Sequence, residues 1–321
     1  MTLHWEGKER LTAVPIPLAK ATSLVRAPLA DGLGELIQGD NLVALRALAK
    51  THAERVTLAY LDPPFFTQRA FTHVERGTRV KTAAFDDRWV DRAAYLEALA
   101  PRIEMLRTLL APHGSMVIHV DPKTSHYVKV LCDEIFGEDA FASEIVWRYR
   151  RWPSKTPNFQ RVHDVLLRYR KDVTCEPRWN PMYEPLAAST LATWGTKKQR
   201  AVFATSDKGD VRRARSSSTS EASNGAPMGD VWEIGVIAPV ARERTGYPSQ
   251  KPEALLERIL AALTSPGDLV LDPYAGSGTT LAVAARMGRR FVGIDASDVA
   301  IETIRARMAG SLALPSAARL R

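Results

Sequence analysis

The sequence predicts an α/β protein built on a doubly wound, mainly parallel sheet of seven strands. Short apolar runs alternate with longer segments whose apolar residues recur at spacings of three and four, which is the pattern of strands and amphipathic helices. An aspartate ends or closely follows four of the predicted strands: Asp40, Asp62, Asp272 and Asp295. Because ligands of such sheets bind beyond the carboxyl ends of the strands, we expect these carboxylates at one site.

Each predicted element rests on a local pattern. We predict strands at residues 36–38, 56–61, 115–120, 143–149, 163–169, 269–272 and 290–295. We predict helices at residues 41–48, 95–110, 127–136, 255–263 and 281–287. Residues 66–90 are interpreted as a loop, and residues 172–246 show little helical or strand period, with a polar run at 212–220. The longer stretch is interpreted as a mobile insert that forms part of a small recognition region.

Composition limits the classes of function. The 321 residues include 44 Lys and Arg against 36 Asp and Glu, and a net charge of +8 favours a polyanionic partner. The two cysteines, Cys132 and Cys175, have neither metal-site spacing nor a disulfide framework, which is consistent with a reducing compartment. With neither a long apolar span nor a signal peptide in the sequence, we expect a cytoplasmic protein without membrane contact.

The first motif is Asp62-Pro63-Pro64-Phe65, directly after the apolar run 56–61. It presents a carboxylate, a rigid carbonyl and a flat ring at the end of a strand. The two prolines lack N–H groups, so the local polar groups can only accept hydrogen bonds. This set suits a planar group with an exocyclic amine, such as a nucleobase. The alternative is an ordinary proline turn after a strand.

The second motif is the glycine-rich turn from Asp272 to Thr280, between a predicted strand and an apolar helix. Gly276 and Gly278 allow a ligand to approach the backbone, and the helix start offers free N–H groups. Asp295 ends the next strand, where an acid can hold the two hydroxyls of a ribose. The turn has neither the G-x-G-x-x-G of dinucleotide sites nor the Gly-Lys-Ser/Thr of a P-loop. The arrangement predicts a site for a nucleoside-containing ligand.

A basic segment interleaved with aromatic residues spans residues 146–171 and holds eight Lys or Arg against one acid. Basic groups neutralise phosphates, and exposed rings stack on bases. We interpret the segment as a nucleic-acid surface; the alternative is a strand pair with a solvated charged face. The candidate contacts are Arg148, Arg150, Arg151, Trp152, Lys155 and Arg161.

At this point the motifs match a known family. The chain resembles the β-class DNA amino-methyltransferases, which move the methyl group of S-adenosylmethionine (SAM) to an exocyclic nitrogen of adenine or cytosine. The resemblance rests on motifs in the circularly permuted order of this class: Gly39-Asp40-Asn41, Asp62–Phe65, His163-Asp164, Tyr247–Glu253 and Asp272–Thr280. It implies a Rossmann-like methyltransferase sheet with a small recognition insert.

The resemblance also implies roles for individual residues. The methionine end of SAM lies near the glycine turn, which contributes Asp272, Tyr274, Gly276, Ser277, Gly278 and Thr279. Asp295 holds the ribose, Asp40 accepts from the adenine amine of SAM, and Gln250, Lys251 and Pro252 close over the methionine portion. At the first motif, Asp62 and the Pro63 carbonyl hold the target amine, Pro64 completes the motif and Phe65 stacks on the flipped base. The alternatives are a helix cap near Asp40 and a solvated cation at Lys251. SAM requires no metal, and the histidines form no ligand cluster.

The resemblance divides the chain into a catalytic half (31–171), a target-recognition insert (172–246) and a SAM-binding half (247–310). Asp62 indicates adenine N6, since cytosine-N4 enzymes usually begin this motif with Ser. Phe65 departs from the Tyr of most adenine enzymes, so the phenolic hydroxyl is missing. The expected partner is double-stranded DNA in the nucleoid; a homodimer and a restriction subunit are left open. RNA or protein methylation, or a non-catalytic specificity subunit, are the rival functions.

Overall fold

The computed structural model describes residues 24–29, 32–74, 81–153, 155, 157–205 and 211–312. The chain forms two compact units, one of Met1–Trp179 with Asp230–Arg321 and one of Asn180–Gly229. Across the described residues, no helix combines the length and the apolar character needed to cross a membrane.

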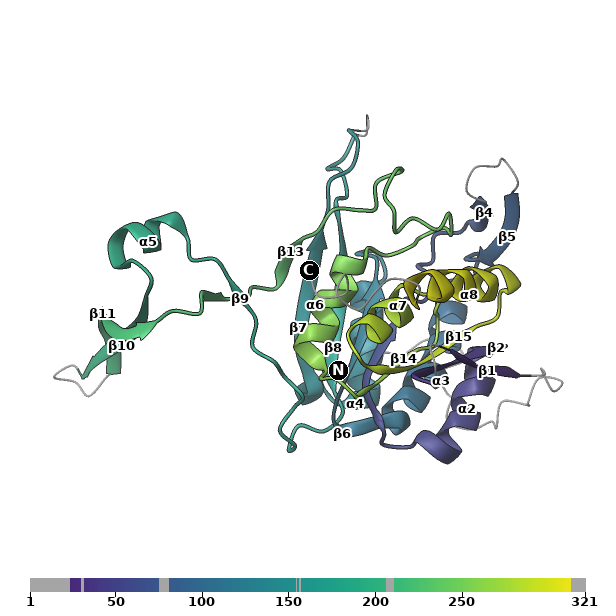
Figure 1. Cartoon of the computed structure of the whole chain (residues 1–321), viewed down its shortest axis with the longest axis horizontal. Helices are drawn as coiled ribbons and strands as arrows, with labels where there is room; N and C mark the ends of the chain where they lie inside the picture. The colour runs from purple at the N-terminus through teal and green to yellow at the C-terminus, as the bar shows by residue number, and fades with distance from the viewer. Residues whose placement is uncertain are drawn as a thin grey trace. The chain divides into compact units, whose positions relative to one another are not determined.

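The first unit is built on a mainly parallel sheet of nine described strands. Figure 1 labels most of them. Their order is β1 (Val25–Leu29), β2 (Gly34–Gln38), β15 (Arg290–Asp295), β14 (Leu269–Asp272), β3 (Val56–Leu61), β6 (Leu110–Val120), β8 (His163–Arg170), β7 (Phe141–Arg148) and β13 (Val231–Glu233). The pairs β1–β2, β6–β8 and β7–β8 are antiparallel, and the others are parallel. The seven predicted strands are the seven inner ones. The two edge strands were missed because β1 is largely exposed and β13 has only three residues.

Two groups of helices cover the sheet. The first group is α2 (Asn41–His52), α3 (Arg92–Leu109) and α4 (Ser125–Phe136), followed by the short 3-10 helix η1 (Glu138–Ala140). The second group is α6 (Glu253–Leu263), α7 (Thr279–Arg286) and α8 (Asp298–Leu312), in green to yellow in Figure 1. Within each group, successive helices contact one another.

The alternation of side chains along the strands places the two helix groups on opposite faces. Leu271, Val292 and Ile294 belong to the core formed with α2, α3 and α4. Gly293 points the other way, and a Cβ there would lie 2.4 Å from Leu281 on α7. The sheet is therefore doubly wound, as the sequence predicts.

Residues 66–90, interpreted as a loop, contain an antiparallel hairpin of β4 (Ala70–Val74) and β5 (Lys81–Asp86). Both strands are mostly exposed, so they lack the apolar alternation that marks a strand at the core. Phe71 and Phe85 stack across the hairpin with ring centroids 4.6 Å apart.

The second unit corrects the expectation that residues 172–246 lack regular structure. It contains the bridge pair β9 (Tyr183–Glu184) and β12 (Ala226–Pro227), the short helix α5 (Ala188–Trp194), and the hairpin of β10 (Lys197–Thr205) and β11 (Val211–Ala222). The polar run 212–220 lies on β11. The hairpin was missed because pairing of the two backbones defines it, whereas its sequence has no apolar alternation.

Candidate active site

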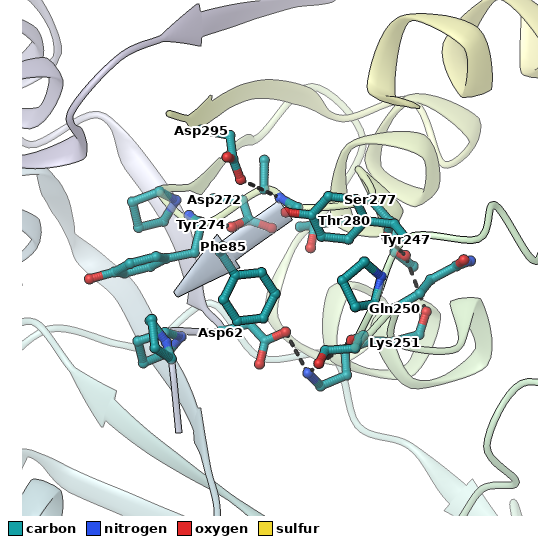
Figure 2. A pocket seen from close by; sticks show the side chains of 18 of the residues that line it. Asp62, Phe85, Tyr247, Gln250, Lys251, Asp272, Tyr274, Ser277, Thr280 and Asp295 are labelled. Carbon is teal, nitrogen blue, oxygen red and sulfur yellow. Dashed lines mark hydrogen bonds and ion pairs between the residues drawn. The ribbon is translucent and has the colours of Figure 1, made fainter. Parts of the chain in front are cut away.

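A pocket of about 270 Å³ lies at the carboxyl ends of the parallel strands β2, β15, β14 and β3 (Figure 2). Parallel neighbours end at the same edge of a sheet, so residues far apart in the sequence meet there. The predicted residues that line it are Asp40, Asp62, Pro63, Pro64, Phe65, Gln250, Lys251, Asp272, Tyr274, Gly276, Ser277, Thr279 and Asp295. The other two predicted residues do not line the pocket: Pro252 is the N-cap of α6 and Gly278 is the N-cap of α7.

The carboxylate of Asp62 has two different environments. Its Oδ2 accepts a hydrogen bond from Lys251 Nζ at 2.5 Å, and the pair is largely buried. Its Oδ1 is buried without a hydrogen-bond partner among the described residues and lies 3.9 Å from His119 Nδ1. Buried carboxylate oxygens are nearly always hydrogen-bonded, so the unpaired Oδ1 leaves this carboxylate with fewer donors than it can accept.

A buried polar cluster of Tyr60, His119 and Asp164 lies next to Asp62. His119 on β6 is fully buried; its Nδ1 lies 3.0 Å from the Tyr60 hydroxyl and its Nε2 lies 3.5 Å from Asp164. Burial, together with the nearby Lys251 charge, lowers the pKa of His119, so the ring is neutral. The His119 ring also packs against Phe65, with centroids 5.4 Å apart. Sequence reasoning named neither His119 nor Tyr60, because a histidine within an apolar strand is typical of a core position.

The loop after the first motif is held by one carboxylate. Asp87 is 1% exposed and accepts hydrogen bonds from the backbone N–H groups of Phe65, Phe66 and Thr67, at 2.8 to 3.1 Å. It also accepts from the Thr67 hydroxyl and from Trp89 Nε1. Phe66 has φ +59°, a left-handed conformation that is unfavourable for a residue with a side chain. Asp87 thus stabilises a strained turn that fixes the position of the Phe65 ring.

The glycine turn is joined to the end of β15. Asp295 Oδ2 accepts from the Gly276 N–H at 2.8 Å, and its Oδ1 accepts from the Ser297 N–H at 2.9 Å. Gly276 has φ +50°, and a Cβ there would lie 3.3 Å from the Tyr247 ring. Each Asp295 oxygen retains a further lone pair, so the carboxylate can still accept hydrogen bonds from a ligand.

Three further predicted residues have polar atoms committed to the protein itself. Asp40 is the N-cap of α2, accepting from Val43 N, and it pairs with Arg102 at 3.1 Å. Gln250 uses its amide on Thr245 and on the Glu243 carbonyl, which closes the 243–250 loop. Lys251 reaches Asp62 at the first motif. The alternative interpretation, a helix cap at this place in the chain, is therefore correct for Asp40 itself. Its carboxylate nevertheless also borders the pocket.

Aromatic rings border the pocket on the side of the β4–β5 hairpin. Phe85 and Tyr247 are stacked with centroids 6.4 Å apart, and Figure 2 shows both rings beside the glycine turn. The sequence predicted Tyr247 only as the first residue of the Tyr247–Glu253 motif and placed Phe85 in the loop 66–90, with no site role for either residue. Their positions depend on the hairpin, which has no clear signal in the sequence.

Asp272 is buried at the end of β14 and accepts from the Tyr274 N–H at 3.0 Å. Burial raises the pKa of Asp272 to about 7, and the nearby Asp62 and Asp295 charges add to the effect. A carboxyl group in this state becomes a stable anion when a cation binds beside it.

We expect the unfolding free energy of the ligand-free protein to fall as the pH rises from 5 to 7. In this interval Asp272 is ionised in the unfolded chain but protonated in the fold, so unfolding releases a proton and higher pH favours it. The raised pKa accounts for roughly 2 kcal/mol over this interval. Urea denaturation at both pH values should show that Asp272→Asn lacks this part of the pH dependence. Parallel profiles for the two proteins would contradict the assignment.

The six candidate DNA contacts lie outside the pocket. Arg148 ends β7, and the other five follow it between β7 and β8. All six are exposed, Trp152 at 93%, although Arg148 pairs with Glu233 and Arg161 pairs with Asp121. Phe159 in the same connection is 99% exposed. Large rings in contact with solvent beside cations form a surface of the kind that binds nucleic acid.

Residues 56–306 match the family model of the N6/N4 DNA methylases. The chain belongs to this family. It is a DNA methyltransferase, and its family uses SAM as the methyl donor.

Two relatives illustrate the similarity. The type II methyltransferase M.EcaI of Enterobacter cloacae is 28% identical over 319 residues, covering 85% of this chain and 69% of its own length. The DNA adenine methyltransferase YhdJ of Escherichia coli (strain K12) is 29% identical over 264 residues, covering 81% of this chain and 77% of its own.

Solved structures share the fold. The PvuII DNA methyltransferase, a cytosine-N4-specific enzyme, has a TM-score of 0.55 at 18% identity, covering 88% of this chain and 86% of its own. The M1.HpyAVI–SAM complex has a TM-score of 0.52 at 19% identity, covering 86% of this chain and 98% of its own. At these identities, the similarity establishes the methyltransferase fold.

Proposed function

We propose that this enzyme transfers the methyl group of SAM to the N6 amine of an adenine that has been flipped out of double-stranded DNA. The observation that carries the proposal is the Asp62 carboxylate, which has an unpaired buried oxygen and stands beside the Phe65 ring at the pocket of the glycine turn. An anion, a rigid prolyl carbonyl and a flat ring together suit an aromatic amine.

The donor set of the pocket fits SAM. Five carboxylates and one lysine line it, which suits a ligand carrying both an ammonium and a sulfonium cation. The turn at Gly276, where a side chain would crowd Tyr247, leaves room for close approach of a ligand. We assign Asp295 to the ribose hydroxyls and Asp272 to the cationic methionine end. SAM supplies an electrophilic methyl group on its sulfonium.

The residues of the first motif activate the target amine by position. The lone pair of an adenine N6 amine is delocalised into the ring, which makes the amine a poor nucleophile. If Asp62 and the Pro63 carbonyl accept its two hydrogens, the nitrogen becomes more nearly tetrahedral and its lone pair points at the methyl group. Forming the N–CH₃ bond breaks the S–CH₃ bond, and the nitrogen then loses one proton. Phe65 stacks on the flipped ring.

Adenine is preferred over cytosine because the motif begins with Asp62. YhdJ is by name an adenine methyltransferase, whereas the PvuII enzyme is cytosine-N4-specific. Methylation of cytosine N4 is therefore the second candidate function. It would use the same carboxylate, because a cytosine also presents an exocyclic amine.

We further assign residues 31–171 to a catalytic half, 172–246 to target recognition and 247–310 to a SAM-binding half. The two-unit division of the chain supports a separate module, with the narrower bounds 180–229. The exposed cations and rings between β7 and β8 are proposed to bind DNA.

A cytoplasmic, nucleoid-associated location follows from the substrate. Whether the enzyme dimerises or acts beside a restriction subunit is open to test by light scattering and co-purification.

The proposal is tested by sequencing DNA from cells that express the protein, with a readout that distinguishes N6-methyladenine from N4-methylcytosine. We expect N6-methyladenine at one short sequence, absent from cells that express Asp62→Asn. N4-methylcytosine would favour the second candidate. Unmodified DNA, from cells with folded protein, would reject both.

Asp87 is predicted to act as a positioning residue through Phe65. Asp87→Asn removes the charge that accepts five hydrogen bonds. We expect kcat to fall about tenfold or more and the unfolding free energy to fall by about 2 kcal/mol. SAM affinity, measured by calorimetry, should stay near wild type, which separates positioning from general damage. The neighbouring Asp86→Asn is the matched control, since Asp86 is exposed and pairs with Arg88, two residues away. Equal losses in both variants would contradict this role.

A further inference from the structure

Lys251 stands where the proposed reaction needs the substrate. Its Nζ donates to Asp62 Oδ2 at 2.5 Å (Figure 2). It also lies 4.9 Å from the centroid of the Phe65 ring. The side chain is 9% exposed. Sequence reasoning had assigned this residue to the methionine portion of SAM.

The two contacts of Lys251 are those that a flipped base would make. The target amine must donate to the Asp62 carboxylate, whose Oδ1 is buried beside His119 and whose Oδ2 is taken by the ammonium here. The centroid of a base stacked on Phe65 would lie about 4.5 Å or slightly more from the centroid of the Phe65 ring. Lys251 Nζ lies at a similar distance from that centroid, 4.9 Å. The buried His119 ring also packs against Phe65, with ring centroids 5.4 Å apart. The ammonium and the base therefore compete for one place.

The ammonium also has an alternative partner close by. Lys251 Nζ lies 3.3 Å from the Ser249 carbonyl, within the loop that precedes α6. The backbone of Lys251 is held separately, because its carbonyl accepts from the Thr279 hydroxyl at 3.1 Å. The flexible side chain can thus leave Asp62 while its backbone stays fixed and its charge keeps one acceptor.

We propose that Lys251 is a placeholder for the target amine: in the DNA-free enzyme its ammonium occupies the base site on Asp62 and Phe65, and the flipped base must displace it. The inference deepens the proposed function and rests on it. The ion pair gives the Asp62 carboxylate a cationic partner and fills the base site while no base is bound. It also lowers the apparent affinity for a flipped base by the fraction of enzyme in which Lys251 still holds Asp62.

The test uses a duplex that contains the methylated sequence found in expressing cells, with 2-aminopurine replacing the base next to the target, so that the target keeps its exocyclic amine. Fluorescence of 2-aminopurine rises when its stacking neighbour is flipped out, and titration yields the dissociation constant. Lys251→Met keeps the apolar stem but removes the charge, so we expect more flipped base and about fivefold tighter binding. Lys251→Arg keeps the charge and can hold Asp62 through two hydrogen bonds, so we expect less flipped base than in wild type.

Lys129→Met is the matched control. Lys129 pairs with Asp133 at 2.7 Å and lies 4.2 Å from the Phe141 ring centroid. It therefore contacts a carboxylate and an aromatic ring, as Lys251 does, but away from the pocket. It should leave the fluorescence unchanged. Weaker or unaltered base binding in Lys251→Met, with SAM binding intact by calorimetry, would overturn the placeholder role. If Lys251→Met fails to fold, an increase in flipped base for Lys251→Arg would overturn it. Failure of the wild-type enzyme to methylate DNA would instead reject the proposed function.

Discussion

Replacing Asp62 by asparagine is expected to lower kcat by about a thousandfold or more, with little change in SAM or DNA affinity. The amide keeps the shape of the carboxylate but loses its charge, and one of its two positions becomes a donor. It can no longer accept from the amine as an anion, so the N6 lone pair stays delocalised into the ring. Single-turnover methylation with a tritiated methyl donor measures the chemical step directly.

Stability has to be measured alongside, because Asp62 is the partner of the buried Lys251 ammonium. Asp62→Asn leaves that charge with a weaker acceptor and should destabilise the fold by about 1 to 3 kcal/mol. The double variant with Lys251→Met should recover part of this loss without recovering methylation. Asp133→Asn, which removes the carboxylate partner of Lys129, is the matched control for losing one charge of such a pair. Turnover near wild type in folded Asp62→Asn would refute the catalytic assignment.

Asp295→Asn is expected to weaken SAM binding by about tenfold to a hundredfold. Hydrogen bonds to a charged group contribute about 1.5 to 3 kcal/mol, and the ribose hydroxyls are assigned to this carboxylate. The substitution also disturbs one of the two backbone bonds that Asp295 accepts from Gly276 and Ser297. Isothermal titration calorimetry with SAM gives the dissociation constant without depending on turnover.

Asp298→Asn controls for this change, since Asp298 is exposed at the start of α8 and accepts from Gln38. It should leave SAM affinity unchanged. If Asp295→Asn melts at the wild-type temperature and binds SAM as well as wild type, the ribose is held elsewhere in the pocket.

Most of the central fold could be predicted from local patterns. The strands 56–61 and 290–295 coincide with β3 and β15, because buried parallel strands are continuous apolar runs bounded by turn residues. Five helices, α2, α3, α4, α6 and α7, also follow from the sequence, since their buried residues recur at helical spacing. The elements that were missed are the helix α8, the short helix η1, the β4–β5 hairpin, the edge strands and the second unit. Their strands are mostly polar or very short and depend on pairing with a partner strand.

The site divides in the same way. The sequence by itself determined which chemical groups are available: Asp62 with its prolines, the glycine turn and Asp295 are recognisable because each follows a predicted strand. Only the tertiary structure decided that the Lys251 ammonium contacts Asp62, that Asp87 holds the turn at Phe65, and that His119 lies 3.9 Å from the Asp62 carboxylate. Local backbone preference acts over a few residues and leaves a recurring pattern. A contact between side chains 189 residues apart, as for Lys251 and Asp62, depends instead on the order of strands in the sheet and on the packing of α6 against it.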